Sequence, residues 1–268
     1  ARGAIAAAAR RFDFSDTARL DAELLMAEAL DIDRDKLLLS PPSRTVPKRF
    51  WTMVERRSGG EPIAYITGAR AFWTIDLAVG PGVLIPRADS ETLLESSLEQ
   101  FRDSPPRRIL DLGTGPGTLL LAALDQWPDA TGIGVDSSPA ALAMARANAA
   151  RLGMADRAVF RDGDWGAGLA GRFDLILANP PYIGTGEMLP VEVVDYEPAD
   201  ALFAGEDGLD AYRRIAPQLS ALLAPGGAAV LEIGATQADA VSALLVAEGF
   251  DVMMVRDLAG HARALIAT

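Results

Sequence analysis

The chain has 268 residues, of which 50% are apolar, 6% aromatic and 23% charged, which excludes a disordered or collagen-like chain. No apolar run reaches the ~20 residues that a bilayer crossing requires, so we expect no membrane association. The chain lacks cysteine and has one histidine, His261, which argues against disulfides, thiolate or multi-histidine metal sites and cysteine nucleophiles. Residues 1–11 mix alanine with arginine and lack the apolar core typical of a signal peptide, so we expect a cytoplasmic protein.

The net charge of −12 is unevenly distributed along the chain. Residues 1–76 carry 12 Lys/Arg and 11 Asp/Glu, whereas residues 77–268 carry 13 Lys/Arg and 26 Asp/Glu. This difference predicts two domains with different partners. The acidic excess argues against direct nucleic-acid binding, because phosphate binding requires a basic surface.

Residues 1–75 are predicted to form a helical domain. Ser15 or Asp16 can cap a helix whose apolar residues recur at near-helical spacing up to Leu30. The segment Ser40–Ser43 is predicted to break a second helical run, and a further helix is expected from Pro47 until the pair Gly59-Gly60 ends it.

The remaining chain is predicted to contain a hairpin and linker region at 76–104 and a catalytic domain at 105–268. Residues 71–79 have the pattern of a short β-hairpin. Strands and helices then alternate, which predicts a mostly parallel sheet covered on both faces. The expected strands are 108–112, 131–136, 158–161, 173–178 and 228–233, and the expected helices include 118–126 and 139–152. The last segments, 251–256 and 263–267, are expected to form an antiparallel pair at the sheet edge.

A glycine-rich loop, Asp111-Leu-Gly-Thr-Gly-Pro-Gly117, follows the first of these strands and opens a helix. Glycines at this place let the backbone approach a ligand at a helix N-terminus. Asp136 ends the next strand, where a carboxylate can accept both hydroxyls of a ribose. The pattern predicts a nucleoside-containing ligand, although the loop alone does not distinguish a dinucleotide from S-adenosylmethionine.

The segment Asn179-Pro-Pro-Tyr182 directly follows the fourth strand of the sheet, at the edge where ligands bind. Its two prolines lack N–H donors, so nearby carbonyl groups are free to accept hydrogen bonds. The carbonyl oxygens of Asn179 and Pro180 can together accept the two N–H bonds of a planar NH₂ group. This arrangement favours methylation of an amide or an exocyclic amine.

Both motifs resemble those of class I S-adenosylmethionine-dependent methyltransferases. Further segments resemble the protein-(glutamine-N5) methyltransferases of peptide chain release factors, the HemK/PrmC family. These segments are Glu61–Gly68, Phe72-Trp73, Leu84–Glu91, Tyr196–Pro198, Asp207–Leu209, Leu231–Gly234 and Asp257–Gly260. The resemblance covers nearly the whole chain, with one departure at Ala88, where the family usually has proline.

The resemblance implies a Rossmann-like class I methyltransferase sheet with a small N-terminal substrate-recognition domain. It implies methyl transfer to the Gly-Gly-Gln glutamine of bacterial class I release factors, which modulates translation termination, by a cytoplasmic monomer that converts S-adenosylmethionine to S-adenosylhomocysteine. The implied cofactor-binding residues are Gly113, Thr114, Gly115, Pro116, Gly117, Asp136, Asp164, Trp165 and Asn179. The implied substrate-binding residues are Asn179, Pro180, Pro181 and Tyr182, among which Asn179, Pro180 and Tyr182 are implied to be catalytic.

Two other functions are compatible with the motifs. A nucleic-acid amino-methylase would use the same Asn-Pro-Pro-Tyr segment, but the acidic charge of residues 77–268 argues against it. A non-catalytic S-adenosylmethionine-binding scaffold would not need that segment. For an amide acceptor we expect catalysis by orientation rather than by a histidine base, which suits a chain with one histidine.

Overall fold

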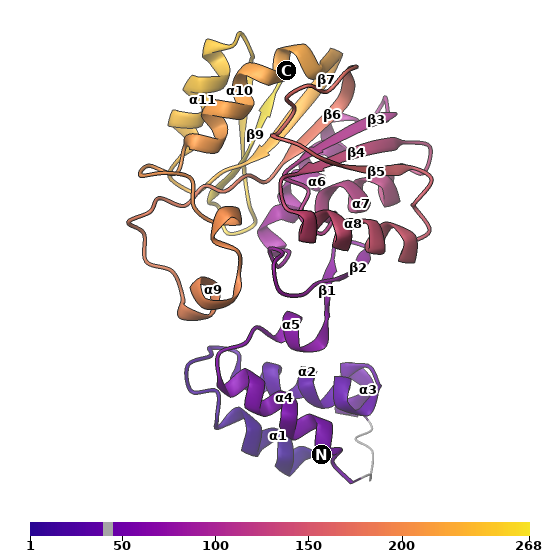
Figure 1. Ribbon diagram of the computed structural model, residues 1–268, viewed down its shortest axis with the longest axis vertical. Coiled ribbons are helices and arrows are strands. Elements are labelled where there is room, and N and C mark those ends of the chain that lie inside the picture. Colours follow the sequence, from indigo (N-terminus) through magenta and orange to yellow (C-terminus); the bar gives the residue numbers. More distant parts are fainter. Residues whose placement is uncertain (40–44) are drawn as a thin grey trace. The chain divides into compact units, whose positions relative to one another are not determined.

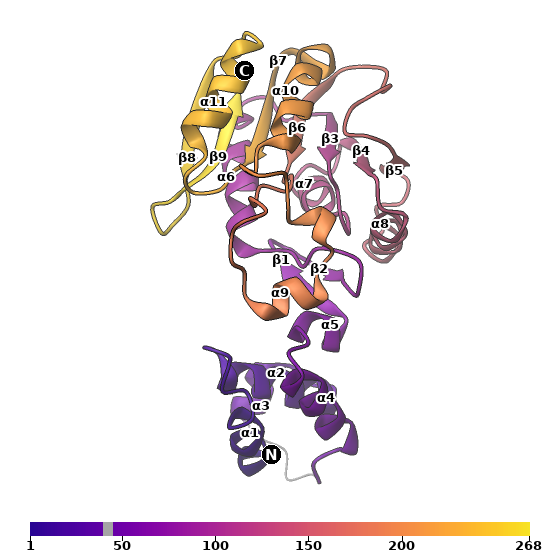
Figure 2. The ribbon, with the colours of Figure 1, turned by 60° about the vertical axis from the view of Figure 1, so that its left-hand side comes forward.

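The computed structural model describes residues 1–39 and 45–268 (Figures 1 and 2). The predicted break at Ser40–Ser43 lies outside the described residues. Within the described ranges, no helix is long and apolar enough to cross a membrane.

The contacts divide the chain into two compact units. The helical unit consists of Ala1–Ala69 together with Pro190–Tyr196, and the sheet unit consists of Arg70–Leu189 together with Glu197–Thr268. The chain therefore passes from one unit to the other at three points in the sequence. The sequence placed the end of the helical domain near residue 75 and did not indicate that a segment of 105–268 joins it.

The helical unit packs short helices around one apolar core in which Phe12, Leu25 and Phe50 are completely buried. Its helices are α1 (Arg2–Ala9), α2 (Ala18–Leu30), α3 (Arg34–Leu39), α4 (Lys48–Ser58), α5 (Ile63–Thr67) and α9 (Val191–Tyr196).

The start of α2 differs from the prediction that Ser15 or Asp16 caps it. The helix begins at Ala18 with Thr17 at the cap position, and the Thr17 side chain accepts no hydrogen bond from a backbone N–H of the helix. Ser15 and Thr17 instead donate their hydroxyl protons to the Asp21 carboxylate, at 2.9 and 3.0 Å. The Asp21 carboxylate is buried beside a positive charge. The hydroxyl groups of Ser15 and Thr17 bond this carboxylate rather than the helix backbone.

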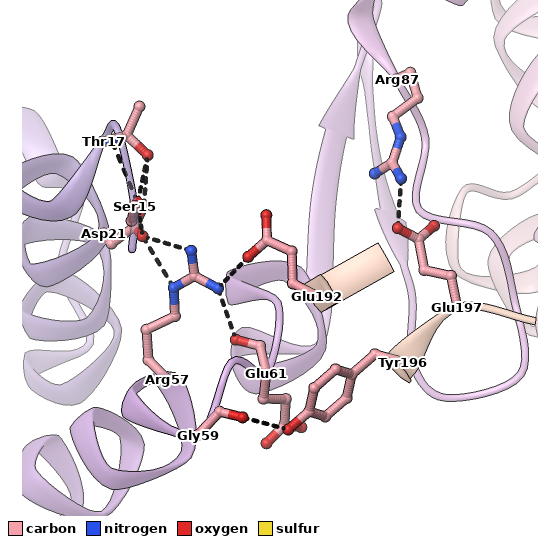
Figure 3. Close-up of polar contacts among 10 residues, drawn as sticks. All are labelled: Ser15, Thr17, Asp21, Arg57, Gly59, Glu61, Arg87, Glu192, Tyr196 and Glu197. Carbon is pink, nitrogen blue, oxygen red and sulfur yellow. Dashed lines mark hydrogen bonds and ion pairs between the residues drawn. The ribbon is translucent and has the colours of Figure 1, made fainter. Parts of the chain in front are cut away.

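The positive charge is Arg57 of α4, which is itself buried (Figure 3). Its Nε and Nη2 both lie 2.9 Å from Asp21 Oδ2. Its Nη1 lies 2.7 Å from Glu192 Oε2 of α9 and donates to the backbone oxygen of Glu61 at 3.2 Å. The ring of Phe14 lies 4.9 Å from the guanidinium carbon. This buried cation therefore has two carboxylates, a backbone oxygen and an aromatic ring as partners.

A second contact holds α9 in the helical unit. Tyr196 donates its hydroxyl proton to the backbone oxygen of Gly59 at 3.0 Å (Figure 3). Directly after Tyr196 the chain returns to the sheet unit, where the buried carboxylate of Glu197 pairs with Arg87 and accepts from the backbone N–H of Ile85 at 3.0 Å. These polar contacts explain why Pro190–Tyr196 belongs to the helical unit.

The sheet unit contains a seven-stranded sheet in the order β5-β4-β3-β6-β7-β9-β8. Its strands are β3 (Arg108–Leu112), β4 (Thr131–Asp136), β5 (Ala158–Asp162), β6 (Phe173–Ala178), β7 (Leu223–Glu232), β8 (Val252–Arg256) and β9 (Ala262–Ala267). The strands from β5 to β7 are parallel, and β9 is antiparallel to both of its neighbours. The predicted fold class, including the antiparallel edge, is confirmed.

Helices cover both faces of this sheet (Figure 1). Alternate residues of β3 show this, because successive side chains of a strand point to opposite faces. Leu110 shares a buried core with α10 (Asp210–Leu222) and α11 (Ala238–Ala247), whereas Asp111 accepts from a backbone N–H of α7 (Thr118–Gln126). Helices α6 (Glu91–Gln100) and α8 (Pro139–Arg151) also contact the strands.

The bounds predicted for the strands of the sheet and for α7 and α8 agree with the structure to within one residue, except that β7 begins five residues earlier than expected, at Leu223. The hairpin begins two residues earlier than expected, at Ala69. The predicted hairpin consists of β1 (Ala69–Phe72) and β2 (Ile75–Ala78). In the parallel part of the sheet, β3 lies between β4 and β6, so the chain crosses over in opposite directions on its two sides. Ligands bind at such a switch point, beyond the carboxyl ends of the strands.

Candidate active site

The glycine-rich loop after β3 turns sharply and then starts α7. Gly113, Gly115 and Gly117 all have positive φ angles, of 74°, 54° and 88°, which favour glycine. The backbone N–H groups of Gly113 and Thr114 both donate to the Val135 carbonyl at 2.9 Å, which ties the loop to β4. A Cβ atom on Gly115 would meet no atom within 4 Å, so this glycine borders open space beside the loop.

Asp111 lies under this loop with its carboxyl group completely buried. Its Oδ2 accepts from the Thr114 hydroxyl at 2.6 Å and from the Leu120 N–H at 3.2 Å, whereas Oδ1 has no partner among the described residues. Burial raises the pKa of Asp111 to about 7, although both hydrogen bonds lower it. A buried oxygen without a partner beside a glycine loop is suited to a ligand that carries a donor.

Asp136, the predicted ribose ligand, ends β4 beside the same loop. Its two carboxylate oxygens accept from the backbone N–H groups of Gly115 at 2.8 Å and Ser138 at 2.9 Å. Because each carboxylate oxygen has two lone pairs, these bonds leave acceptor capacity for hydroxyl groups. The structure thus brings Asp136 and the glycine loop together, as the sequence predicted.

The predicted adenine pair, Asp164 and Trp165, follows β5, and its two members have different surroundings. Trp165 has a positive φ of 55°, and its ring would lie 3.1 Å from a Cβ on Gly113. The ring therefore contacts the glycine-rich loop. Asp164 is exposed, and its carboxylate forms an ion pair with Arg214 of α10. Only the tryptophan of this pair touches the loop.

The segment Asn179–Tyr182 begins where β6 ends, next to the glycine loop. The backbone oxygen of Asn179 would lie 3.9 Å from a Cβ on Gly113, so the two motifs are neighbours across β3 and β6. The Asn179 side chain donates from Nδ2 to Ser90 Oγ at 3.0 Å. Pro180 is buried and Pro181 is half-buried.

Tyr182 is held at both its hydroxyl and its backbone. Its hydroxyl donates to Glu232 Oε1 at 3.4 Å, and its backbone oxygen accepts from Gln237 Nε2 at 2.9 Å. Burial and the nearby Glu232 raise the pKa of Tyr182 to about 12, so its hydroxyl stays protonated near neutral pH. Its half-buried ring packs against the core beside α10.

Comparisons with known proteins agree with this geometry. Residues 3–68 match the family model described as the PrmC N-terminal domain, and residues 103–245 match a methyltransferase domain. A release factor glutamine methyltransferase from Rhodospirillum rubrum is 43% identical over 93% of this chain and 78% of its own length. The same enzyme from Caulobacter vibrioides is 41% identical over 94% of this chain and 89% of its own.

The chain belongs to the release factor glutamine methyltransferase family. This confirms the resemblance and the enzyme class predicted from the sequence. Solved structures with less sequence identity share the fold of this family member. A methyltransferase from Pyrococcus furiosus matches with a TM-score of 0.55 at 18% identity, over 72% of this chain and 88% of that one. A 16S rRNA methyltransferase of T. thermophilus, in complex with AdoMet and guanosine, matches at 0.54 and 21% identity, over 74% and 49%.

Sequence reasoning assigned no role to three residues near the site, although each lies in a segment that resembles the family. Ser90 of the 3₁₀ turn Ala88–Ser90 contacts Asn179, and Glu232 at the end of β7 contacts Tyr182. The third is Glu197, whose buried carboxylate holds the loop around Ile85. Glu232 had one usable signal, because it is the single charge in the apolar run of β7 at a strand's carboxyl end. Ser90 had none beyond the resemblance.

Proposed function

We propose that this protein transfers the methyl group of S-adenosylmethionine to the side-chain amide nitrogen of the glutamine in the Gly-Gly-Gln motif of class I peptide chain release factors. Family membership supports the reaction class and the acceptor. The proposal is carried by one observation: Gly113 of the glycine-rich loop lies next to Asn179, the first residue of the segment Asn179–Tyr182. A methyl donor on the loop and an amide on the segment would then meet at one edge of the sheet.

The residues present are suited to S-adenosylmethionine. The open space beside Gly115 leaves room for a ligand against the glycine-rich loop, whose backbone is tied to Asp136 and to β4. In our proposal Asp136 accepts the ribose hydroxyls and the Trp165 ring packs on the adenine. When bound, S-adenosylmethionine supplies an electrophilic methyl group on a sulfonium centre.

The acceptor nitrogen is a poor nucleophile, because its lone pair is delocalised into the carbonyl group. We propose that the side-chain oxygen of Asn179 and the backbone oxygen of Pro180 accept hydrogen bonds from its two N–H groups and so aim the lone pair at the methyl group. A C–N bond would form as the methyl–sulfur bond breaks, S-adenosylhomocysteine would leave, and the nitrogen would lose one N–H proton to solvent. Preorganised acceptors of this kind also stabilise the positive charge that develops on nitrogen. Tyr182 would close the site against water with its ring.

The partner of this site is proposed to be the release factor itself, bound by a monomeric cytoplasmic enzyme without direct nucleic-acid contact. The family model for residues 3–68 supports a role of the helical unit in recognising that partner at a place away from the glutamine. The acidic balance of residues 77–268 supports a protein rather than a phosphate-rich acceptor.

The test supplies labelled S-adenosylmethionine with three acceptors: a release factor, a tRNA and rRNA mixture, and DNA. We expect label in the release factor and none in a matched release factor whose motif glutamine is replaced by alanine. Labelling of either nucleic acid in preference to the release factor would replace our proposal by the amino-methylase alternative.

The site itself is tested with Asn179→Ala in single-turnover reactions. Removing one preorganised polar group from an active site costs ~10²–10³-fold in rate, and we expect a loss of this size. Asn179→Asp keeps an acceptor oxygen and is expected to retain part of the activity. An alanine variant with a nearly normal rate would place the chemistry elsewhere.

A further inference from the structure

Gln237, at the start of α11, makes a contact that the reaction proposed above does not use. Its Nε2 donates to the backbone oxygen of Tyr182 at 2.9 Å, across 55 positions of sequence. Tyr182 is the last residue of the candidate substrate segment Asn179–Tyr182. The loop at Asp207–Leu209 reaches the same peptide group, so segments that lie far apart in the sequence meet at one point behind the site.

The segment Asn179–Tyr182 depends on an anchor at this end, because its middle cannot be tied by backbone donors. Pro180 and Pro181 carry no backbone N–H, and their rings fix φ at about −65°, so the pair is stiff. The first end of the segment is fixed by the sheet, where Ala178 of β6 pairs with both neighbouring strands. The direction of the Pro180 carbonyl therefore depends on how the Tyr182 end is held.

The carboxamide of Gln237 is oriented by its surroundings so that its donor end faces Tyr182. The backbone N–H of Gly234 donates to Gln237 Oε1 at 3.0 Å. Because a backbone N–H can only donate, this end of the carboxamide is the oxygen, and the NH₂ group is directed to the Tyr182 carbonyl. A Cβ on Gly234 would lie 2.9 Å from Gln237 Oε1, so glycine gives this bond its room.

Gly208 brings a second backbone against the same peptide group. It is buried, its φ of 71° favours glycine, and a Cβ there would collide with the Tyr182 backbone oxygen. The neighbouring Asp207 holds this turn, because its carboxylate accepts from Arg213 Nη1 at 3.0 Å. The backbone oxygens of Gly208 and Asp207 lie 3.3 and 3.5 Å from Gln237 Nε2, so one NH₂ group gathers three carbonyl groups.

We propose that Gln237 is a positioning residue for methyl transfer: it holds the Tyr182 carbonyl and, through the stiff proline pair, sets the direction in which the Pro180 carbonyl meets the substrate amide. Gly208 permits this contact by leaving room beside it. The inference rests on the proposed function of Asn179 and Pro180. Gln237 itself touches neither substrate nor cofactor, and it exchanges no proton with the reacting nitrogen.

Two substitutions of Gln237 separate its two hydrogen bonds. Gln237→Glu keeps an acceptor for the Gly234 N–H but turns an oxygen toward the Tyr182 carbonyl, whereas Gln237→Met keeps the length and loses both bonds. Misplacement in an active site can cost on the order of 10²-fold, so we expect single-turnover methyl transfer at saturating release factor to slow ~10- to 100-fold in both variants. The Glu variant should be at least as slow as the Met variant.

Two further measurements distinguish positioning from general support of the fold. The release factor concentration that gives half the maximal rate, and the S-adenosylmethionine affinity in calorimetry, should both stay at their wild-type values in the Gln237 variants. The matched control is Gln100→Glu, which adds the same charge at the exposed end of α6 and should keep the wild-type rate.

Gly208→Ala tests the same contact from the other side. Its matched control is Gly153→Ala, because Gly153 has a φ of 70° and a Cβ there would meet no atom within 4 Å. Both variants place alanine at nearly the same left-handed φ, so their backbone strain is alike, and only Gly208→Ala presses on Tyr182. We expect Gly208→Ala to be slow and Gly153→Ala to be normal.

A wild-type rate for Gln237→Glu would overturn the inference, because the bond to Tyr182 would then not affect catalysis. A loss of cofactor affinity as large as the loss of rate would also overturn it, and so would equal rates for the two glycine variants. Normal Gln237 variants beside a slow Asn179→Ala would leave the proposed function standing. A normal Asn179→Ala rate would instead overturn the proposed function itself.

Discussion

Arg57 in the helical unit and Glu232 in the sheet unit are both charged side chains in buried positions, with 5% and 1% of their surface exposed. Arg57 has two carboxylates, a backbone oxygen and an aromatic ring around it. Glu232 accepts one hydrogen bond, from the Tyr182 hydroxyl; its other carboxylate oxygen has no partner among the described residues, and burial raises its pKa to about 7.

The difference in partners between Arg57 and Glu232 distinguishes a buried charge that holds the fold together from one that lies in the candidate active site. A buried ion costs several kcal/mol in lost hydration unless partners replace the water around it. For Arg57 the partners are complete, so the residue holds α9 in the helical unit. For Glu232 they are incomplete, which is typical of groups whose protonation state matters to a site. Asp111 under the glycine loop is of the second kind, also with a pKa of about 7 and an unpartnered oxygen.

The largest expected effect on stability comes from Arg57→Met. The substitution leaves the buried Asp21 without its cation, and breaking a buried pair in this way costs about 3–5 kcal/mol. Unfolding in denaturant should show this loss in the free energy of unfolding of the helical unit. The control is Arg11→Met, which breaks the more exposed pair with Glu55 and should leave the transition nearly unchanged. Equal effects of the two variants would show that the buried Arg57–Asp21 pair contributes no more to stability than the exposed Arg11–Glu55 pair.

Glu232→Gln is expected to stabilise the protein at alkaline pH. The folded pKa of about 7 exceeds the ordinary value of 4.5, so between these pH values the folded state binds the proton and the unfolded state does not. The contribution of Glu232 to stability therefore falls as pH rises through this window. Above pH ~7 the free energy of unfolding of the Gln variant should exceed that of wild type by about 3 kcal/mol.

Denaturant unfolding of both proteins, at about pH 5 and about pH 8.5, checks this difference. A stability difference that does not vary with pH would show that Glu232 is as well compensated as Arg57.

Asp136→Ala tests a carboxylate whose environment is intermediate between the two. Asp136 is half-buried and accepts two backbone N–H bonds, which lose their acceptor in the variant. Leaving hydrogen-bonding groups unpaired costs about 1–3 kcal/mol, and we expect S-adenosylmethionine affinity to fall by that amount in calorimetry. Asp162→Ala, at the neighbouring position of β5, is the matched control and should bind normally. Unchanged affinity of the Asp136 variant would remove the ribose assignment.

The sequence by itself determined most of the fold. Strands such as Phe173–Ala178 are uninterrupted apolar runs, and the alternation with helices permits few topologies other than a parallel sheet. The glycine loop, Asp136 and Asn179 could be placed together because the carboxyl ends of parallel strands share one edge. These inferences depend on near neighbours in the chain and on the connection rules of strands and helices.

Only the tertiary structure decided which distant side chains meet. Ser90 reaches Asn179 across 89 positions, and Arg57 reaches Glu192 across 135. No periodicity in the sequence predicts that the two members of either pair meet, because they lie in separate segments. Burial likewise raises the pKa of the Glu232 carboxyl group to about 7, whereas the residue type alone predicts a value of 4.5. Hydration is lost only when the chain has folded around the group, which is why the sequence could not reveal it.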